Sequence, residues 1–105
     1  MEINLKNKTA IVTGSTRGIG LAIATILANA GANVIISGRS QTKCNETAES
    51  LSKQATGQII GIAADIANAD SAKQLITTTL NQFNTIDILV NNAGITKDNL
   101  ILRLS

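Results

Sequence analysis

The residues best placed to do chemistry in this sequence are three glycines within seven positions, in the segment TGSTRGIG at 13–20. The segment joins a short apolar run to a run with helical spacing. Where a helix follows a buried parallel strand, its first N–H groups lack partners and carry the positive end of the helix dipole, so the corner attracts anions. We expect Gly14 to permit the turn, Gly18 to leave room for a phosphate, and Gly20 to let the helix approach the sheet.

The glycine spacing leaves two interpretations open. It is Gly-x-x-x-Gly-x-Gly, which differs from the Gly-x-Gly-x-x-Gly fingerprint of dinucleotide sites, and no Gly-Lys-Ser/Thr follows it as in a Walker loop. Glycines at such a turn can also serve only the close packing of a helix on a strand. The strand before the motif, the helix after it and the crossover units around it favour the binding interpretation.

Two arginines indicate which nucleotide would bind. A site for NAD usually places Asp or Glu near the end of the second strand, where it binds the ribose 2′-hydroxyl. This sequence instead reads SGRS at 37–40, with Arg39 and no acid before Glu46. In a sheet of order 3-2-1-4 the carboxyl ends of the first two strands are neighbours, so Arg17 and Arg39 can converge on one 2′-phosphate. We therefore predict NADP(H) as the cofactor, the alternative being two solvated surface arginines.

The elements that must position these residues alternate along the chain. Four short runs rich in apolar and β-branched residues have the composition of buried strands: 9–13, 33–37, 58–65 and 86–91. Strands that alternate with crossover helices predict an α/β fold, a Rossmann-like parallel sheet with helices on both faces. We expect the strand order 3-2-1-4, truncated after the fourth strand, in one incomplete NADP-binding domain over residues 1–105.

Helical spacing of apolar residues fills the intervals between these strands. The first helix is expected to bury a stripe made of Ile19, Ala22, Ile23, Ile26, Leu27 and Ala30. The second should bury Cys44, Ala48, Leu51 and Ala55. The third, capped by Asn68, should bury Ala72, Leu75, Ile76, Leu80 and Phe83. The closing segment DNLILRLS, 98–105, has the pattern of a fourth helix that is just beginning.

Composition and charge exclude several function classes. The net charge of +2 is spread along the chain and Phe83 is the one aromatic residue, which argues against nucleic-acid binding. No apolar run approaches the roughly 18–20 residues that cross a bilayer. A single cysteine, Cys44, and no histidine give neither a disulfide nor a zinc site. We expect a cytoplasmic protein without metal, nucleic acid or membrane partners.

Two motifs together resemble the short-chain dehydrogenase/reductase family, and the resemblance runs the length of the chain. TGSTRGIG at 13–20 resembles the family's cofactor loop, and NNAG at 91–94 resembles its fourth-strand signature. The segment DILVNNAGITKDNLILRL, 87–104, is similar to bacterial 3-oxoacyl-[acyl-carrier-protein] reductases. The resemblance implies an NADPH-dependent oxidoreductase of fatty acid biosynthesis, a homo-oligomer that reduces a 3-oxoacyl thioester carried on acyl carrier protein.

The resemblance also implies cofactor contacts at individual positions. The pyrophosphate and adenosine end would be lined by the glycine loop, which comprises Gly14, Ser15, Thr16, Arg17, Gly18, Ile19 and Gly20, with Arg39 at the 2′-phosphate. Asp65 would accept a hydrogen bond from the adenine amino group, beside Ile66. Asn91 would contact the ribose, and the floor beneath it would be formed by Asn92, Ala93 and Gly94. Asp65 as a loop cap and Asn91 as a partner of backbone groups are the plainer alternatives.

The family's catalytic residues are missing from this sequence. They are a Tyr that donates a proton, a Lys four residues later, a Ser and a more distant Asn, and the chain contains no Tyr. A ketone accepts hydride readily only if its developing oxyanion is protonated or stabilised. No residue is therefore assigned a catalytic role, and the chain alone is expected to bind NADP(H) without turnover.

Other functions stay open at this point. The chain could be a stand-alone non-catalytic nucleotide-binding module. It could also be a truncated product that self-associates through the uncovered edge of its fourth strand and through Leu100, Ile101, Leu102 and Leu104. A methyltransferase that binds adenosylmethionine is a more distant alternative, because its site also normally has an acid at the end of the second strand.

Overall fold

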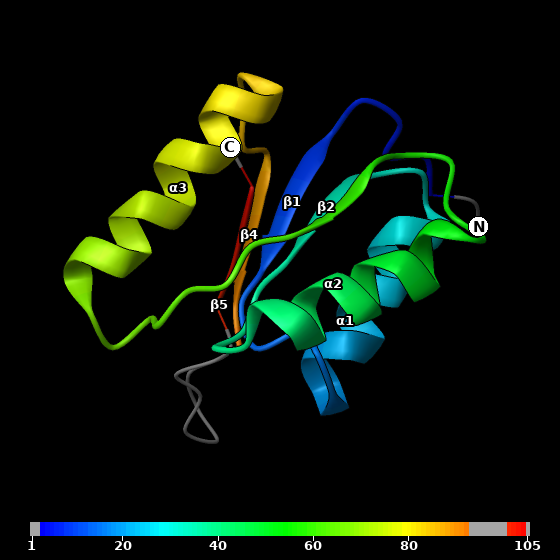
Figure 1. Ribbon diagram of the computed structural model, residues 1–105. Coiled ribbons are helices and arrows are strands. Elements are labelled where there is room, and N and C mark those ends of the chain that lie inside the picture. The colour runs from blue at the N-terminus through cyan, green and yellow to red at the C-terminus, as the bar shows by residue number, and fades with distance from the viewer. Residues whose placement is uncertain (1–2, 93–100, 105) are drawn as a thin grey trace.

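The computed structural model describes residues 3–92 and the backbone of 101–104 (Figure 1). In chain order its elements are β1 (Thr9–Val12), α1 (Gly18–Asn29), β2 (Asn33–Ile36), α2 (Gln41–Ser52), β3 (Ile59–Gly61), α3 (Ala69–Phe83), β4 (Ile88–Asn91) and β5 (Ile101–Leu104). They form a five-stranded sheet of order β3-β2-β1-β4-β5. The strands β1 to β4 pair in parallel, which confirms the predicted order 3-2-1-4.

Helices cover both faces of the sheet, with α1 and α2 on one face and α3 on the other (Figure 1). Successive residues of a strand point to opposite faces, so each face buries its own set of side chains. In β1, Ala10 and Val12 belong to the core under α1 and α2, whereas Ile11 belongs to the core under α3. Every residue of β1 is buried, as expected of a strand at the centre of a parallel sheet.

The buried face of α1 matches the predicted stripe only in part, because Ile23 and Leu27 pack partly buried against the core. Gly20, Ala24 and Ala28, spaced four apart, are the buried residues. By contrast, Ile19 and Ile26 are 66% and 64% exposed. Apolar residues surround most of this helix, so their spacing alone did not define one face. The small residues turn inward because α1 lies close to the sheet.

The prediction for the start of α3 is confirmed, and the prediction for α2 is confirmed for three of its four residues. Ala55 lies beyond the end of α2 at Ser52 and packs partly buried against the core. On α2 the buried residues are Cys44, Ala48 and Leu51. At the start of α3, the side chain of Asn68 accepts a hydrogen bond from the Ser71 N–H at 3.0 Å. This bond satisfies one of the N–H groups that a helix leaves without a partner in its first turn.

The prediction for the inner face of α3 is wrong at one residue. Leu80 is 40% exposed, and the neighbouring Thr79 is fully buried instead. The hydroxyl of Thr79 donates a hydrogen bond to the Leu75 carbonyl at 2.8 Å. Because this bond satisfies the hydroxyl within its own helix, a polar side chain occupies the inner face without an unpaired group.

The segment 101–104 is a strand and not the predicted fourth helix. β5 pairs antiparallel with β4, with Ile101 opposite Asn91 and Leu104 opposite Ile88. A short apolar run suits either structure, and the N–H and C=O groups along β4 provide the partners that decide between them. The prediction that the edge of β4 is left without a neighbouring strand is therefore wrong. The proposed association through Leu100 and the side chains of 101–104 lies outside the described residues.

The described part of the chain contains neither a membrane-spanning helix nor a cluster of metal ligands. No helix in it is long and apolar enough to cross a membrane. No three His, Cys, Asp or Glu side chains in that part gather where they could hold a metal ion.

Candidate cofactor site

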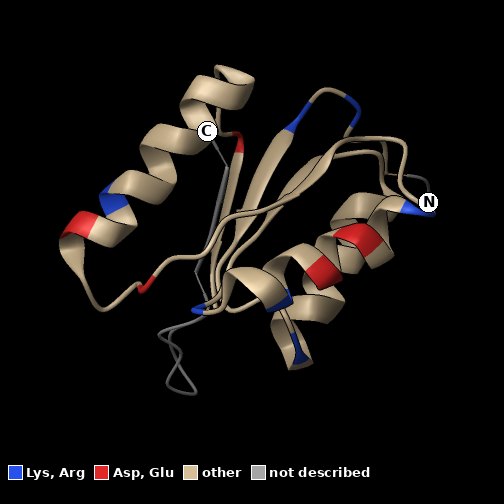
Figure 2. Cartoon of the chain, in the orientation of Figure 1, with Lys and Arg blue, Asp and Glu red and all other residues tan. Residues whose placement is uncertain are grey.

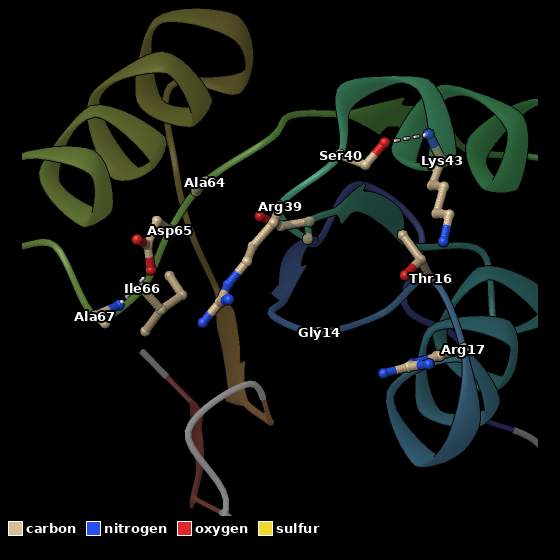
Figure 3. Close-up of a pocket in the computed structure, with 12 residues that line it drawn as sticks. Gly14, Thr16, Arg17, Arg39, Ser40, Lys43, Ala64, Asp65, Ile66 and Ala67 are labelled. Carbon is tan, nitrogen blue, oxygen red and sulfur yellow. Dashed lines mark hydrogen bonds between the residues drawn. The ribbon is translucent and has the colours of Figure 1, made fainter.

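A cavity of about 800 Å³ opens where β1, β2 and β3 end (Figure 3). Its lining is formed by Gly14, Thr16, Arg17, Ser37, Gly38, Arg39, Ser40, Lys43, Ala64, Asp65, Ile66 and Ala67. The volume falls within the range of small-molecule sites, roughly 300–1,000 Å³. The carboxyl ends of the strands are also where open α/β sheets bind their ligands.

The three glycines after β1 have the geometry that their spacing predicts. Gly14 and Gly18 have φ of 60° and 62°, in the left-handed region that favours glycine. A Cβ atom on Gly20 would collide with the Gly14 carbonyl and with the side-chain amide of Asn92, whereas one on Gly18 would meet nothing within 4 Å. Gly14 therefore makes the turn, Gly20 allows the close approach of α1, and Gly18 leaves open space at the start of the helix.

The amino end of α1 has no side-chain cap. Arg17 occupies the N-cap position without a capping hydrogen bond, and the first turn of the helix contains no acidic residue. Ser, Thr, Asp and Asn are strongly preferred at this position. The N–H groups and the positive dipole end of α1 are thus left for an anion.

Ser15 links the glycine loop to the end of β2. The Ser15 N–H donates to the Ser37 carbonyl at 2.9 Å, and the Ser15 hydroxyl accepts from the Ser37 N–H at 2.9 Å. One strand further, the Ala64 N–H donates to the Gly38 carbonyl at 2.8 Å. These bonds hold the ends of the three strands together. Ser15 itself is fully buried behind the cavity wall, where it supports the loop.

The two sequence motifs contact each other directly. The side-chain amide of Asn92 donates to the Gly14 carbonyl at 3.0 Å, and its backbone N–H donates to the Thr13 hydroxyl at 2.8 Å. The Thr13 hydroxyl in turn donates to the side-chain oxygen of Asn91 at 3.3 Å. Asn91, which accepts this hydrogen bond, is half-buried beside the loop. Two predicted contacts of this motif lie outside the described residues: Ala93 and Gly94.

Asp65 and Ile66 form another part of the cavity wall, after β3 (Figure 3). One carboxylate oxygen of Asp65 accepts a hydrogen bond from the Ala67 N–H at 3.0 Å, and the Asp65 N–H donates to the Ser71 hydroxyl at 2.9 Å. The loop-cap interpretation of Asp65 is confirmed. It also keeps the exposed carboxylate in the wall of the cavity.

Positive charge gathers around this cavity. Figure 2 shows Lys and Arg segments close together at the end of the sheet where β1 and β2 finish. Arg17 and Arg39 line one cavity, as their positions in the sequence predicted, and Lys43 joins them from α2. Asp65 is the one carboxylate in the described lining, and none of the three cations forms an ion pair within residues 3–92. The cavity suits a strongly anionic ligand.

Sequence reasoning missed several lining residues. They are Ser37, Gly38, Ser40, Lys43, Ala64 and Ala67. The available signal was that 37–43 spans the turn after β2 and the first turn of the next helix, where side chains face the same edge as the glycine loop. Conversely, Gly18 and Ile19 are exposed and Gly20 is buried on the inward face of α1, and none of these three lines the cavity.

The sequence model of the short chain dehydrogenases matches residues 8–105. The chain belongs to the short-chain dehydrogenase family. Within this family of oxidoreductases, it is 45% identical over 105 residues to the 3-oxoacyl-[acyl-carrier-protein] reductase FabG of Aquifex aeolicus. This alignment covers 100% of this chain and 42% of the relative. The chain is 47% identical over 90 residues to dehydrogenase/reductase SDR family member 4 of Caenorhabditis elegans, covering 86% of this chain and 35% of the relative. The chain thus spans about two fifths of such relatives.

Two solved structures of other proteins share this fold. A hydroxysteroid dehydrogenase from Escherichia coli matches with a TM-score of 0.81 and 34% identity, over 87% of this chain and 37% of that one. The Pseudomonas aeruginosa RhlG/NADP active-site complex also gives a TM-score of 0.81, with 39% identity over 90% of this chain and 37% of that one. The second structure is a complex with NADP.

Proposed function

We propose that this chain is the cofactor-binding part of an NADPH-dependent 3-oxoacyl-[acyl-carrier-protein] reductase of fatty acid biosynthesis. The observation that carries the proposal is that Arg17 and Arg39 line one cavity while no acidic residue follows β2 before Glu46. A carboxylate at that position would favour the 2′-hydroxyl of NAD, whereas guanidinium groups favour the 2′-phosphate of NADP. The NADP complex of RhlG supports the same choice, and the FabG relative supports the reductase activity.

The described residues fit the parts of a phosphorylated dinucleotide. The uncapped amino end of α1, with open space at Gly18, suits the pyrophosphate. Arg17 and Arg39 would hold the 2′-phosphate, and Asp65 with Ile66 would contact the adenine. When bound, the cofactor supplies a hydride to a carbonyl carbon.

The remaining motif residues have supporting roles in this proposal. Ser15 and Gly20 fix the shape of the loop through the contacts described above. Further cofactor contacts are assigned to Gly14, Thr16, Ile19, Asn91, Ala93 and Gly94.

Reduction of a 3-oxoacyl thioester on acyl carrier protein also needs a proton donor to the developing oxyanion. This sequence contains neither Tyr nor His, so its residues bind and orient the cofactor.

Titration of the chain with NADPH and with NADH tests the proposed cofactor. A charge-assisted hydrogen bond contributes about 1.5–3 kcal/mol, so we expect NADPH to bind about tenfold to a hundredfold more tightly. Arg39→Asp should abolish this preference. Lys53→Asp makes the same charge change at the carboxyl end of α2, away from the cavity, and should leave the preference intact. Equal affinities of the unmodified chain for the two cofactors would reject the proposal.

A further inference from the structure

Lys43 is a cation of the cavity wall that neither motif contains. α2 begins at Gln41 after the N-cap residue Ser40, so Lys43 is the third residue of the helix. Its backbone N–H donates to the Ser40 hydroxyl at 3.2 Å, which fixes the first turn at the cavity. Figure 3 shows the Lys43 side chain extending toward Thr16, whereas Arg39 extends toward Asp65 and Ile66. The two cations therefore approach the cavity from different sides.

A lysine at this position is unfavourable for the helix on its own. The positive end of the helix dipole stabilises acidic side chains in the first turn and disfavours cations there. α3 follows this rule with Asp70, but the first turn of α2 contains no acid. Glu46, one turn later, forms no ion pair with Lys43 in the described structure. An anion at this helix end would relieve the conflict, because the dipole and the ammonium group both attract it.

Ser37 provides an independent indication of a ligand in the same cavity. The residue is 1% exposed, yet its hydroxyl oxygen has no hydrogen-bond partner within the described chain. Buried polar groups in native proteins are almost always paired, and exceptions call for a missing partner such as a ligand. Ser15 holds the backbone of Ser37 through three hydrogen bonds, so this residue is fixed in the lining of the cavity.

We propose that Lys43 and the amino end of α2 bind the phosphomonoester of the cofactor, the 2′-phosphate, opposite Arg39. This inference rests on the proposed function and adds to it a residue that determines nucleotide specificity. A phosphomonoester carries a charge of about −1.5 to −2 at neutral pH, so it gains from Lys43 as a further cation beside Arg17 and Arg39. A nucleotide without this phosphate would not contact Lys43. The affinity of the chain for that nucleotide would therefore not depend on the Lys43 side chain.

The test uses two nucleotides that differ only in this phosphate, 2′,5′-ADP and 5′-AMP, titrated into the chain by calorimetry. We expect Lys43→Gln to weaken 2′,5′-ADP about tenfold and to leave 5′-AMP unchanged. Lys43→Arg, which keeps the charge, should restore most of the affinity. Lys53→Gln is the matched control at the other end of α2 and should change neither affinity. Lys43 is exposed, so its replacement removes no core contact, and circular dichroism verifies the fold.

The outcomes separate this inference from the proposed function. If the unmodified chain prefers 2′,5′-ADP and Lys43→Gln keeps that preference, the role of Lys43 is wrong while the proposed function stands. Equal weakening of both nucleotides by Lys43→Gln would also overturn the assignment of Lys43 to the 2′-phosphate. If the unmodified chain does not distinguish the two nucleotides, both the proposed function and the role of Lys43 fail.

Discussion

Replacing Gly20 by alanine tests whether close packing, and not helix propensity, requires glycine at this position of α1. On propensity alone the change would be stabilising, because Ala is favoured over Gly in a helix by about 0.8–1.0 kcal/mol. The added Cβ atom would, however, collide with the Gly14 carbonyl and with the side chain of Asn92. These two effects have opposite signs, so the sign of the measured change distinguishes them.

We expect the packing effect to be the larger one. Forcing one extra carbon into a packed contact costs about 1–3 kcal/mol, and here the obstacle is a backbone carbonyl that no side-chain rotation can move. The displacement would also break the hydrogen bond from Asn92 to Gly14, worth about 0.5–1.5 kcal/mol net. After the propensity gain is subtracted, the free energy of unfolding should fall by roughly 0.5–3.5 kcal/mol.

Urea denaturation followed by far-ultraviolet circular dichroism measures this change. The matched control is Ala22→Gly on the exposed side of the same helix, which should lose about 1 kcal/mol through propensity alone. A Gly20→Ala chain that is more stable than the unmodified chain would refute the reasoning, because it would mean that the contact relaxes without cost.

Two further predictions concern buried groups near the cavity. Ser15→Ala should lower the free energy of unfolding by about 1–3 kcal/mol, because the buried Ser37 N–H loses its acceptor; an unchanged urea midpoint would contradict this. Burial raises the pKa of the Cys44 thiol above its ordinary value of 9.0, so the unfolded chain loses this proton first as the pH rises. The free energy of unfolding should therefore be unaffected by Cys44 below about pH 8 and should fall above about pH 9, and Cys44→Ala should remove that part of the pH dependence in a denaturation series.

Local signals in the sequence located the four parallel strands and the turn-forming glycines, and the alternation of strands with helices then predicted the strand order. The β-branched runs mark buried strands, and each glycine of the loop has a backbone or packing reason that its position already indicated. The cap at Asn68 was predictable for the same reason, since its hydrogen bond to Ser71 joins residues three positions apart.

The features that the sequence did not predict depend on contacts between distant segments. The inward face of α1 is set by its distance from the sheet, and Ile19 and Ile26 are exposed although they are apolar. The strand at 101–104 exists because β4 offers hydrogen-bond partners. Lys43 was missed because it lies in the first turn of α2, beyond the turn that follows β2, and only the placement of α2 brings it to the cavity.

The hydrogen bond from Asn92 to Gly14 joins residues 78 positions apart. The shape of the glycine loop is therefore not encoded in the loop alone. A designer who grafts TGSTRGIG onto another βαβ scaffold would need to bring an amide donor from a neighbouring strand as well. In the natural chain, a displacement of Asn92 would be transmitted to the glycine loop through this amide and through the hydrogen bond from the Asn92 N–H to Thr13.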